Sequence, residues 1–251
     1  MWWAVGIFGN IVIKSDDIST ATRRHAHRQA DSETPMNNPE FWTFFETDAY
    51  PKLGHRQQSL KYVFEYLDHL ARPVFVVETG CVRNVGTWAE EGQSTILFDH
   101  FVSQLPGSVM HSVDLDPRAT ALCSSLVSST VQLHTGDSVA YLRALARNPP
   151  PGFRYIDVLY LDSFDIDFAN PHPSALHHMK ELVAISTLIG PQTLVVVDDS
   201  PLEVNYFLSS NRPTFVSKPV VSGKGKYVAE YAETIGLVPV FTGYQTGWVG
   251  F

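Results

Sequence analysis

The chain has 251 residues, of which 44% are hydrophobic and 18% are charged, values typical of a globular protein rather than a disordered one. Its formal net charge of −8 argues against a nucleic-acid partner, because neutralising a phosphate backbone requires a basic face. No apolar run reaches the roughly 18 residues of a membrane span, so we expect no membrane partner. Only two cysteines are present, which excludes a disulfide scaffold and fits a reducing, cytoplasmic location.

Residues 1–72 are interpreted as an N-terminal arm followed by a helical lid. Met1–Ile13 is apolar, but no basic residue precedes it, so we favour a docked strand over a signal peptide. Between Phe41 and Leu70, positions 60, 63, 67 and 70 fall on one helical face, which predicts one or two helices. The aromatic residues of this arm are compatible with a partner surface in a homo-oligomer.

The remaining part, residues 73–251, alternates short apolar runs with helical patterns. Strands are predicted at 73–78, 108–116, 131–134, 155–162, 193–199, 238–244 and 247–251. Helices are predicted at 94–102, 119–127, 138–146, 175–189 and 226–236. This alternation indicates an α/β, Rossmann-like fold with a seven-stranded, mostly parallel sheet and helices on both faces. The short turn between the last two strands predicts a hairpin, so the last strand should be antiparallel.

Acidic residues fall at the carboxyl ends of these strands, where open α/β sheets bind their ligands. Glu78 closes the first strand and is followed by Gly80, a pattern that suits a ligand with an ammonium group better than a pyrophosphate. Asp114 closes the second strand and is placed to accept the hydroxyls of a ribose. Asp137 and Ser138 follow the third strand beside an adenine position, although Asp137 equally suits a helix cap.

Three further carboxylates end the next two strands, namely Asp162, Asp198 and Asp199. Adjacent strands lie about 4.8 Å apart, so we expect these groups to converge at one rim and to repel one another. A divalent cation would remove that repulsion, and ligands that are all oxygen favour Mg²⁺, Mn²⁺ or Ca²⁺. In the alternative interpretation Asp199 caps the following segment and Asp162 is solvated.

The succession VVETG, SVDLD, GDS, LYLD and VVVDDS resembles class I S-adenosylmethionine (SAM)-dependent methyltransferases over about residues 73–251. Within that superfamily the chain is similar to the metal-dependent O-methyltransferases of the catechol and macrocin types. The resemblance implies SAM and Mg²⁺ as cofactors and a small hydroxylated acceptor, such as a sugar, a phenol or a natural product. The implied cofactor residues, from the methionine end to the adenine, are Glu78, Gly80, Ser94, Asp114, Asp137 and Ser138. The implied metal ligands are Asp162, Asp198 and Asp199.

The general base does not follow from the resemblance, because the chain departs from both patterns after Asp162. Asp165 stands where the catechol type has a lysine, and Phe164 stands where the macrocin type has an aspartate. Asp165 is therefore one predicted base, and His177 on the following helix is another. The GKGK segment, Gly223–Lys226, is interpreted as a solvated turn that starts a helix, or else as a clamp on an anionic group.

Other functions stay open at this point. Asp114-Leu-Asp116 is a D-x-D motif, which in a metal-dependent glycosyltransferase holds Mn²⁺ on a nucleotide diphosphate. A metal-free methyltransferase acting on nitrogen or carbon shares the same fold, since fold does not determine the acceptor. A non-catalytic relative that only binds the cofactor is a third alternative.

Overall fold

The structure, a computed structural model, describes residues 38–167, 169–203, 206–209, 212–216 and 219–251. These residues belong to one compact unit, Met36–Phe251. The strand predicted at Met1–Ile13 lies outside the described residues. In the part of the chain that the structure describes, no helix combines the length and the apolar composition needed to cross a membrane.

Helical segments open the described chain, as the sequence predicts. Helix α1 (Pro39–Phe44) is capped by Asn38, whose side chain accepts a hydrogen bond from the Phe41 amide at 3.3 Å. One π-helical turn and two 3₁₀ turns carry the chain to α2 (Gln57–His69). The apolar side of α2 is buried in the same hydrophobic cluster as α1, α4 and the strands. These helices therefore form part of the domain core.

A six-stranded sheet forms the centre of the fold, in the order β10-β5-β4-β1-β2-β3. Its strands are β1 (Phe75–Thr79), β2 (Val109–Asp114), β3 (Val131–Thr135), β4 (Val158–Leu161), β5 (Leu194–Val197) and β10 (Thr246–Val249). Every neighbouring pair is parallel except β10 with β5, which confirms the antiparallel last strand.

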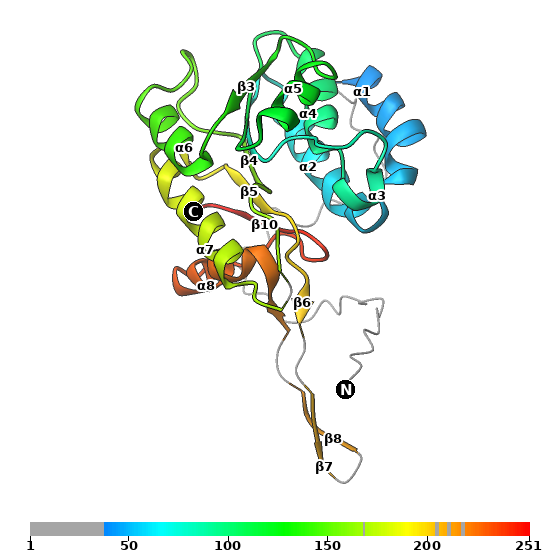
Figure 1. The fold of residues 1–251 in the computed structure, drawn as a ribbon, viewed down its shortest axis with the longest axis vertical. Coiled ribbons are helices and arrows are strands. Elements are labelled where there is room, and N and C mark those ends of the chain that lie inside the picture. The colour runs from blue at the N-terminus through cyan, green and yellow to red at the C-terminus, as the bar shows by residue number, and fades with distance from the viewer. Residues whose placement is uncertain (1–37, 168, 204–205, 210–211, 217–218) are drawn as a thin grey trace. The chain divides into compact units, whose positions relative to one another are not determined.

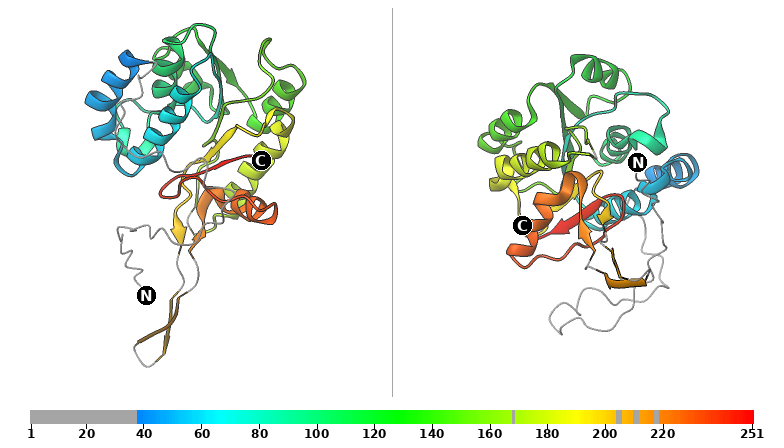
Figure 2. Two further views of the ribbon diagram at one scale, coloured as in Figure 1. Left: turned by 180° about the vertical axis from the view of Figure 1, so that it is seen from behind. Right: turned by 60° about the horizontal axis from the view of Figure 1, so that its bottom comes forward.

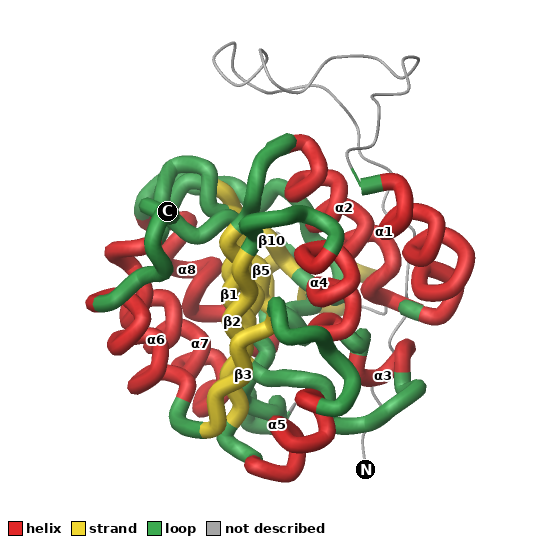
Figure 3. The backbone as a smooth tube through the Cα atoms, turned by 90° about the horizontal axis from the view of Figure 1, so that it is seen from above, coloured by secondary structure: helices red, strands yellow, loops and turns green. Residues whose placement is uncertain are grey.

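Helices cover both faces of this sheet (Figures 1 and 3). Besides α1 and α2, they are α3 (Trp88–Glu91), α4 (Ser94–Ser103), α5 (Pro117–Ser124), α6 (Ser138–Arg147), α7 (His172–Ile185) and α8 (Lys226–Thr234). Figure 3 shows α1, α2 and α4 on one side of the strands and α6, α7 and α8 on the other. Figure 2 shows the same two layers from two further directions.

Successive residues of the central strands enter two different hydrophobic clusters. In β1, Val76 packs with α2 and α4, whereas Phe75 and Val77 pack with the helices of the opposite face. In β5, Val196 and Val195 divide in the same way. Because both faces are covered, the strands read as continuous apolar runs rather than as alternating ones.

The strand predicted at 238–244 is wrong, and the main sheet of the described chain has six strands instead of seven. This segment forms only an isolated bridge between Phe241 and Gly247. Val238 is 77% exposed and Val240 is 40% exposed, so the apolar residues that suggested a strand are not buried. Strands that the sequence analysis missed form two small antiparallel pairs, β6 (Leu202–Glu203) with β9 (Val220–Val221) and β7 (Tyr206–Ser209) with β8 (Arg212–Val216).

Candidate functional site at the carboxyl ends of the strands

The parallel register brings the predicted acidic residues to one edge of the sheet. Thr79 of β1 pairs with Val113 of β2 and with Leu161 of β4, and Leu161 pairs with Val197 of β5. The residues that follow these positions therefore share one rim. Glu78 points from β1, Asp114 ends β2, Asp162 follows β4, and Asp198 and Asp199 follow β5.

Glu78 is a fully buried carboxylate with an incomplete set of partners. Its Oε2 accepts hydrogen bonds from the hydroxyls of Thr95 and Ser112, both at 2.7 Å, whereas its Oε1 has no partner. Burial raises the pKa of Glu78 to about 7, although the hydroxyls of Ser112, Ser94 and Thr95 lower it in part. An unpartnered buried oxygen is costly, and a ligand ammonium would satisfy it.

Gly80, Ser94, Asp114 and Asp162 line one small cavity of about 20 Å³. That volume is close to the space of a single water molecule, so a nucleoside ligand could enter only if the surrounding loops moved. Asp114 accepts the backbone amides of Cys81 at 3.1 Å and of Asp116 at 2.8 Å. The structure thus brings these four predicted residues together.

Gly80 has a reason for being glycine that the sequence analysis did not identify. Its φ is +82°, and a Cβ there would lie 2.5 Å from the carbonyl oxygen of Asp162. The glycine therefore allows the backbones after β1 and β4 to touch. The resemblance implies that Gly80 lets a cofactor approach, but the close approach in the structure is by Asp162.

The residues after β3 hold α6 in place. Asp137 caps α6, since its Oδ1 accepts the Ala140 amide at 2.7 Å, which confirms the capping interpretation. Ser138 Oγ lies 2.9 Å from His177 Nε2 on α7, and the same nitrogen lies 3.3 Å from Oε1 of the buried Glu181. Ser138 and His177 are therefore brought together in a network with Glu181, which sequence reasoning missed.

Asp165 lies on the outside of this rim. Its side chain is 72% exposed, and both of its oxygens are 2.9 Å from Nη1 of Arg83. Nε of Arg83 also lies 3.2 Å from Glu91. Arg83 and Glu91 both line the small cavity, so this chain of charges joins the loop after β1 to the loop after β4 beside it.

The D-x-D motif is divided between two local arrangements. Asp116 caps α5 and pairs with Arg118, with 2.9 Å between Oδ2 of the aspartate and Nη2 of the arginine. Asp114 instead receives two backbone amides and lines the cavity. The two carboxylates are held by different partners, which counts against the glycosyltransferase alternative.

The three carboxylates of the predicted metal site do converge. Asp162, Asp198 and Asp199 each offer an oxygen within 4.8 Å of the others. Asp198 is fully buried, and Asp199 adopts a left-handed backbone with φ of +43°. The sequence predicts this clustering correctly. We refer to these three residues below as the acidic cluster.

Two cations that the sequence analysis did not select are inserted into the acidic cluster. Arg56 binds Asp198 through two nitrogens, with Nε at 3.0 Å from Oδ1 and Nη2 at 2.8 Å from Oδ2. Lys224 Nζ bonds to Oδ1 of Asp162 and lies 3.0 Å from Oδ2 of Asp199. Both cations are buried.

The GKGK segment does start a helix, α8, as interpreted, but it is not a solvated turn, because Lys224 is buried against the carboxylates. Its flanking glycines were the available signal, since paired glycines often mark close backbone packing. Arg56 carried no such signal, because a basic residue before a helix is ordinary. Its partner lies 142 residues away in the sequence.

The acidic cluster as folded does not fit a divalent ion. The donor atoms are of the right kind for Mg²⁺ and are close enough together. However, Arg56 and Lys224 already occupy these oxygens, and each places a full positive charge within hydrogen-bond distance of them. An ion at this point would be repelled by both cations.

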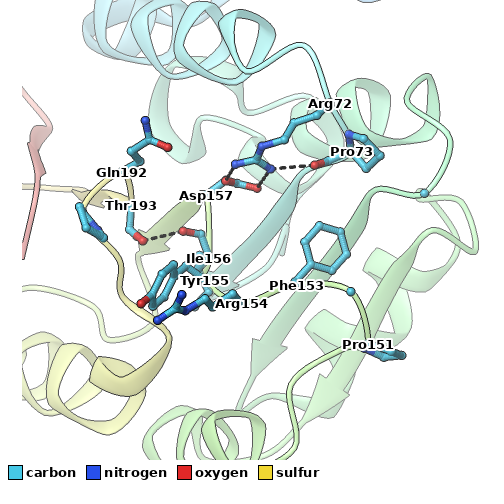
Figure 4. Close-up of a pocket in the computed structure, with 13 residues that line it drawn as sticks. Arg72, Pro73, Pro151, Phe153, Arg154, Tyr155, Ile156, Asp157, Gln192 and Thr193 are labelled. Atoms are coloured by element: carbon cyan, nitrogen blue, oxygen red, sulfur yellow. Dashed lines mark hydrogen bonds and ion pairs between the residues drawn. The ribbon is translucent and has the colours of Figure 1, made fainter.

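A larger cavity lies at the opposite end of the strands, with a volume of about 790 Å³ (Figure 4). Arg72 and Asp157, which both line it, form an ion pair with 2.6 Å between Nη2 and Oδ1. None of the predicted site residues lines it. Because ligands of such sheets bind at the carboxyl ends of the strands, we do not assign the function to this cavity.

No protein-family profile matches the chain. No curated protein matches it either. Among solved structures, the chain is similar to the MycE methyltransferase of mycinamycin biosynthesis in complex with Mg, SAH and mycinamycin VI. The identity is 20% and the TM-score 0.42, over 67% of this chain but only 40% of MycE.

Two further similar structures match along most of their length. DhpI in complex with SAH has 13% identity and a TM-score of 0.40, over 85% of this chain and 93% of DhpI. A SAM-dependent methyltransferase from Clostridium acetobutylicum has 10% identity and a TM-score of 0.41, over 85% and 99% of the two chains.

Proposed function

We propose that this protein transfers a methyl group from SAM to a hydroxyl group of a small molecule. The observation that carries the proposal is Glu78, a buried carboxylate with an unpartnered oxygen at the rim of the sheet. It shares this rim with Asp114 and with Ser94, which begins α4. This arrangement supports a ligand that carries an ammonium group, a carboxylate and a ribose, all of which SAM has.

Each residue has a proposed role in holding the cofactor. Glu78 accepts the methionine ammonium, and Ser94 at the start of α4 binds the methionine carboxylate, which a helix N-terminus favours. Asp114 keeps lone pairs for the ribose beyond the two that its backbone partners use. Asp137 and Ser138 lie beside the adenine.

The transfer itself is an in-line displacement. The acceptor oxygen forms a bond to the methyl carbon while the carbon–sulfur bond breaks. The electron pair of the broken carbon–sulfur bond stays on sulfur, which becomes a neutral thioether. The proton of the acceptor hydroxyl leaves to a base. The protein contributes mainly by aligning the two reacting atoms. Asp165 and His177 stay predictions for the base. The metal assistance that the sequence predicts at Asp162, Asp198 and Asp199 does not enter this step, because Arg56 and Lys224 pair with these carboxylates.

Calorimetric titration with SAM tests this proposal directly. We expect micromolar binding by the wild-type protein and a loss of roughly tenfold or more in Glu78→Gln, which removes a charge-assisted hydrogen bond. Glu65→Gln is the matched control, because Glu65 is a half-exposed carboxylate paired with Lys61 on α2.

A titration with a nucleotide sugar and Mn²⁺ distinguishes the glycosyltransferase alternative. If the protein bound that ligand and not SAM, the methyltransferase proposal would be overturned. SAM binding that is equally strong in Glu78→Gln and in wild type would contradict the role of Glu78 alone.

A further inference from the structure

We propose that Lys224, together with Arg56, takes the place of a divalent cation in the acidic cluster, so that this cluster binds no metal ion. The absence of metal binding is independent of the proposed function. Only the consequence for catalysis rests on it.

Lys224 bridges two members of the cluster. Its ammonium bonds to Oδ1 of Asp162 and lies 3.0 Å from Oδ2 of Asp199, while its side chain is only 2% exposed. A lysine on the surface would keep its ammonium in water. Burial of this group therefore requires the carboxylates as partners, in the same way that the carboxylates require a cation.

The backbone places Lys224 there and leaves it little freedom. A Cβ at Gly223 would lie 2.0 Å from the carbonyl oxygen of Asp199, and one at Gly225 would lie 2.5 Å from Oγ of Ser200. The Lys224 amide donates to the same Asp199 carbonyl at 3.0 Å. The residues on both sides of the lysine are thus in contact with the segment that carries two of the three carboxylates.

Arg56 supplies the second positive charge in the acidic cluster, where it pairs with Asp198. It engages both oxygens of Asp198, and Gln245 Nε2 donates to Oδ1 of the same group at 2.9 Å. Nη2 of Arg56 also lies 3.6 Å from Oδ1 of Asp199. Two positive charges that belong to the chain therefore lie against the three carboxyl groups, and both oxygens of Asp198 accept hydrogen bonds.

This arrangement has a consequence for the proposed reaction. Asp162 is the member of the cluster that lines the small cavity beside Gly80 and Asp114. Lys224 is a positioning residue, because it holds the Asp162 carboxylate at that wall. It also places a fixed positive charge behind it, where a metal would otherwise supply one for the acceptor oxygen.

Titration of the full chain with Mn²⁺, followed by electron paramagnetic resonance of free Mn²⁺, tests the proposal without any activity assay. We expect no stoichiometric binding by the wild-type protein. Lys224→Ala should bind one Mn²⁺ per chain at least roughly tenfold more tightly than wild type, because the repelling charge is gone. Lys226→Ala is the matched control, since Lys226 belongs to the same GKGK segment and should behave like wild type.

Each result decides the question. Wild-type binding of one Mn²⁺ that Asp199→Asn abolishes would overturn the proposal, and this measurement remains valid if Lys224→Ala does not fold. A folded Lys224→Ala that binds no Mn²⁺ would also overturn it. Binding by Lys224→Ala that is lost in Lys224→Ala/Asp199→Asn supports it.

The failure of this proposal is distinguishable from the failure of the proposed function. SAM calorimetry in the presence of EDTA reports on the cofactor site, whereas Mn²⁺ resonance reports on the cluster. SAM binding that is unchanged by EDTA is expected if both proposals hold.

Discussion

At the scale of single residues, the buried environment of Glu78 changes the pKa of its carboxyl group in a way that can be tested. Its pKa is raised to about 7 from an ordinary 4.5, so the folded chain holds a proton that the unfolded chain releases. Between these two pKa values the folded state binds more protons, and the free energy of unfolding therefore falls as the pH rises. Above the folded-state pKa, Glu78 is a buried charge that lowers the stability of the protein. Groups at functional sites commonly have such shifted pKa values.

We predict that Glu78→Gln removes this pH dependence. The free energy of unfolding of the variant minus that of wild type should therefore be roughly 2–3 kcal/mol larger at about pH 8 than at about pH 5. One pKa unit corresponds to about 1.4 kcal/mol. Urea denaturation at both pH values measures it, with Glu65→Gln as the control. Parallel curves for wild type and Glu78→Gln would show that Glu78 titrates normally.

The sequence reveals the carboxylates of the site but not the cations. Glu78, Asp114, Asp162 and the Asp198–Asp199 pair could be predicted because each lies at or just after the end of a recognisable strand, and parallel strands share an edge. Lys224 lies on a short 3₁₀ turn, where no periodic pattern places a side chain. Charge balance alone predicts that some cation must be present, and a metal was the simplest candidate.

At the scale of elements, two loops meet beside the small cavity. Arg83 after β1 bonds to Asp165 after β4 and to Glu91 in α3, and all of these contacts are partly exposed. Exposed ion pairs contribute only about 0–1 kcal/mol, so the contact can break readily. A cavity of about 20 Å³ must open for any cofactor to enter.

Arg83→Ala should therefore speed the entry of SAM. We expect its association rate constant to rise by roughly threefold or more, because loss of about 1 kcal/mol from a closed state is a factor of about five in population. Stopped-flow fluorescence measures the rate, and Arg118→Ala, which removes an exposed pair outside the cavity, is the control. An unchanged rate would mean that this ion pair does not limit entry.

Glycine substitutions separate backbone conformation from packing. Gly223 and Gly236 both have positive φ, at +62° and +80°, so alanine is strained at either position. Only Gly223 faces a neighbour, the Asp199 carbonyl at 2.0 Å from the added Cβ, whereas Gly236 has nothing within 4 Å. We predict a loss of about 1 kcal/mol for Gly236→Ala and at least about 3 kcal/mol for Gly223→Ala. Thermal unfolding of both variants measures the difference, and equal losses would contradict the packing argument.

Most elements could be predicted from hydrophobic pattern, and the errors have identifiable causes. The strands β4 and β5 are continuous apolar runs, and β1 begins as one, because both of their faces are covered. The segment 238–244 has a similar composition, but it lies at the surface and its valines stay exposed. The pattern counts apolar residues and does not say whether another element covers them. The number of strands in the sheet therefore depends on packing between elements, which the sequence pattern does not contain.

At the scale of the whole molecule, Arg56 joins the N-terminal helices to the rim of the sheet. It lies just before α2, and its partner Asp198 follows β5, 142 residues later. Arg56 also donates from Nη1 to the backbone carbonyl of Ala89 at 3.0 Å, which ties in the loop that contains α3. Its side chain is 4% exposed and that of Asp198 is 1% exposed. One guanidinium thus connects three segments that are distant in sequence.

We predict that Arg56→Ala destabilises the protein by roughly 3–5 kcal/mol at neutral pH, because it leaves Asp198 buried with its charge poorly compensated. Burial alone acts to raise the pKa of Asp198, but Arg56, with smaller contributions from Lys224 and Gln245, holds this pKa below its ordinary value. In wild type the resulting stabilisation is present above the unfolded pKa and is lost only as the pH falls through the folded one.

Without Arg56 the direction of the pKa shift of Asp198 reverses. The pKa of Asp198 rises, the carboxyl accepts a proton more easily in the folded state, and the deficit of Arg56→Ala should shrink as the pH falls toward about 5. Arg56→Ala/Asp198→Asn should recover much of the lost stability at neutral pH, since the uncompensated charge is gone. Denaturation of the four members of this double-mutant cycle at both pH values measures the coupling. Losses in the single variants that simply add would show that Arg56 acts by packing and not through Asp198.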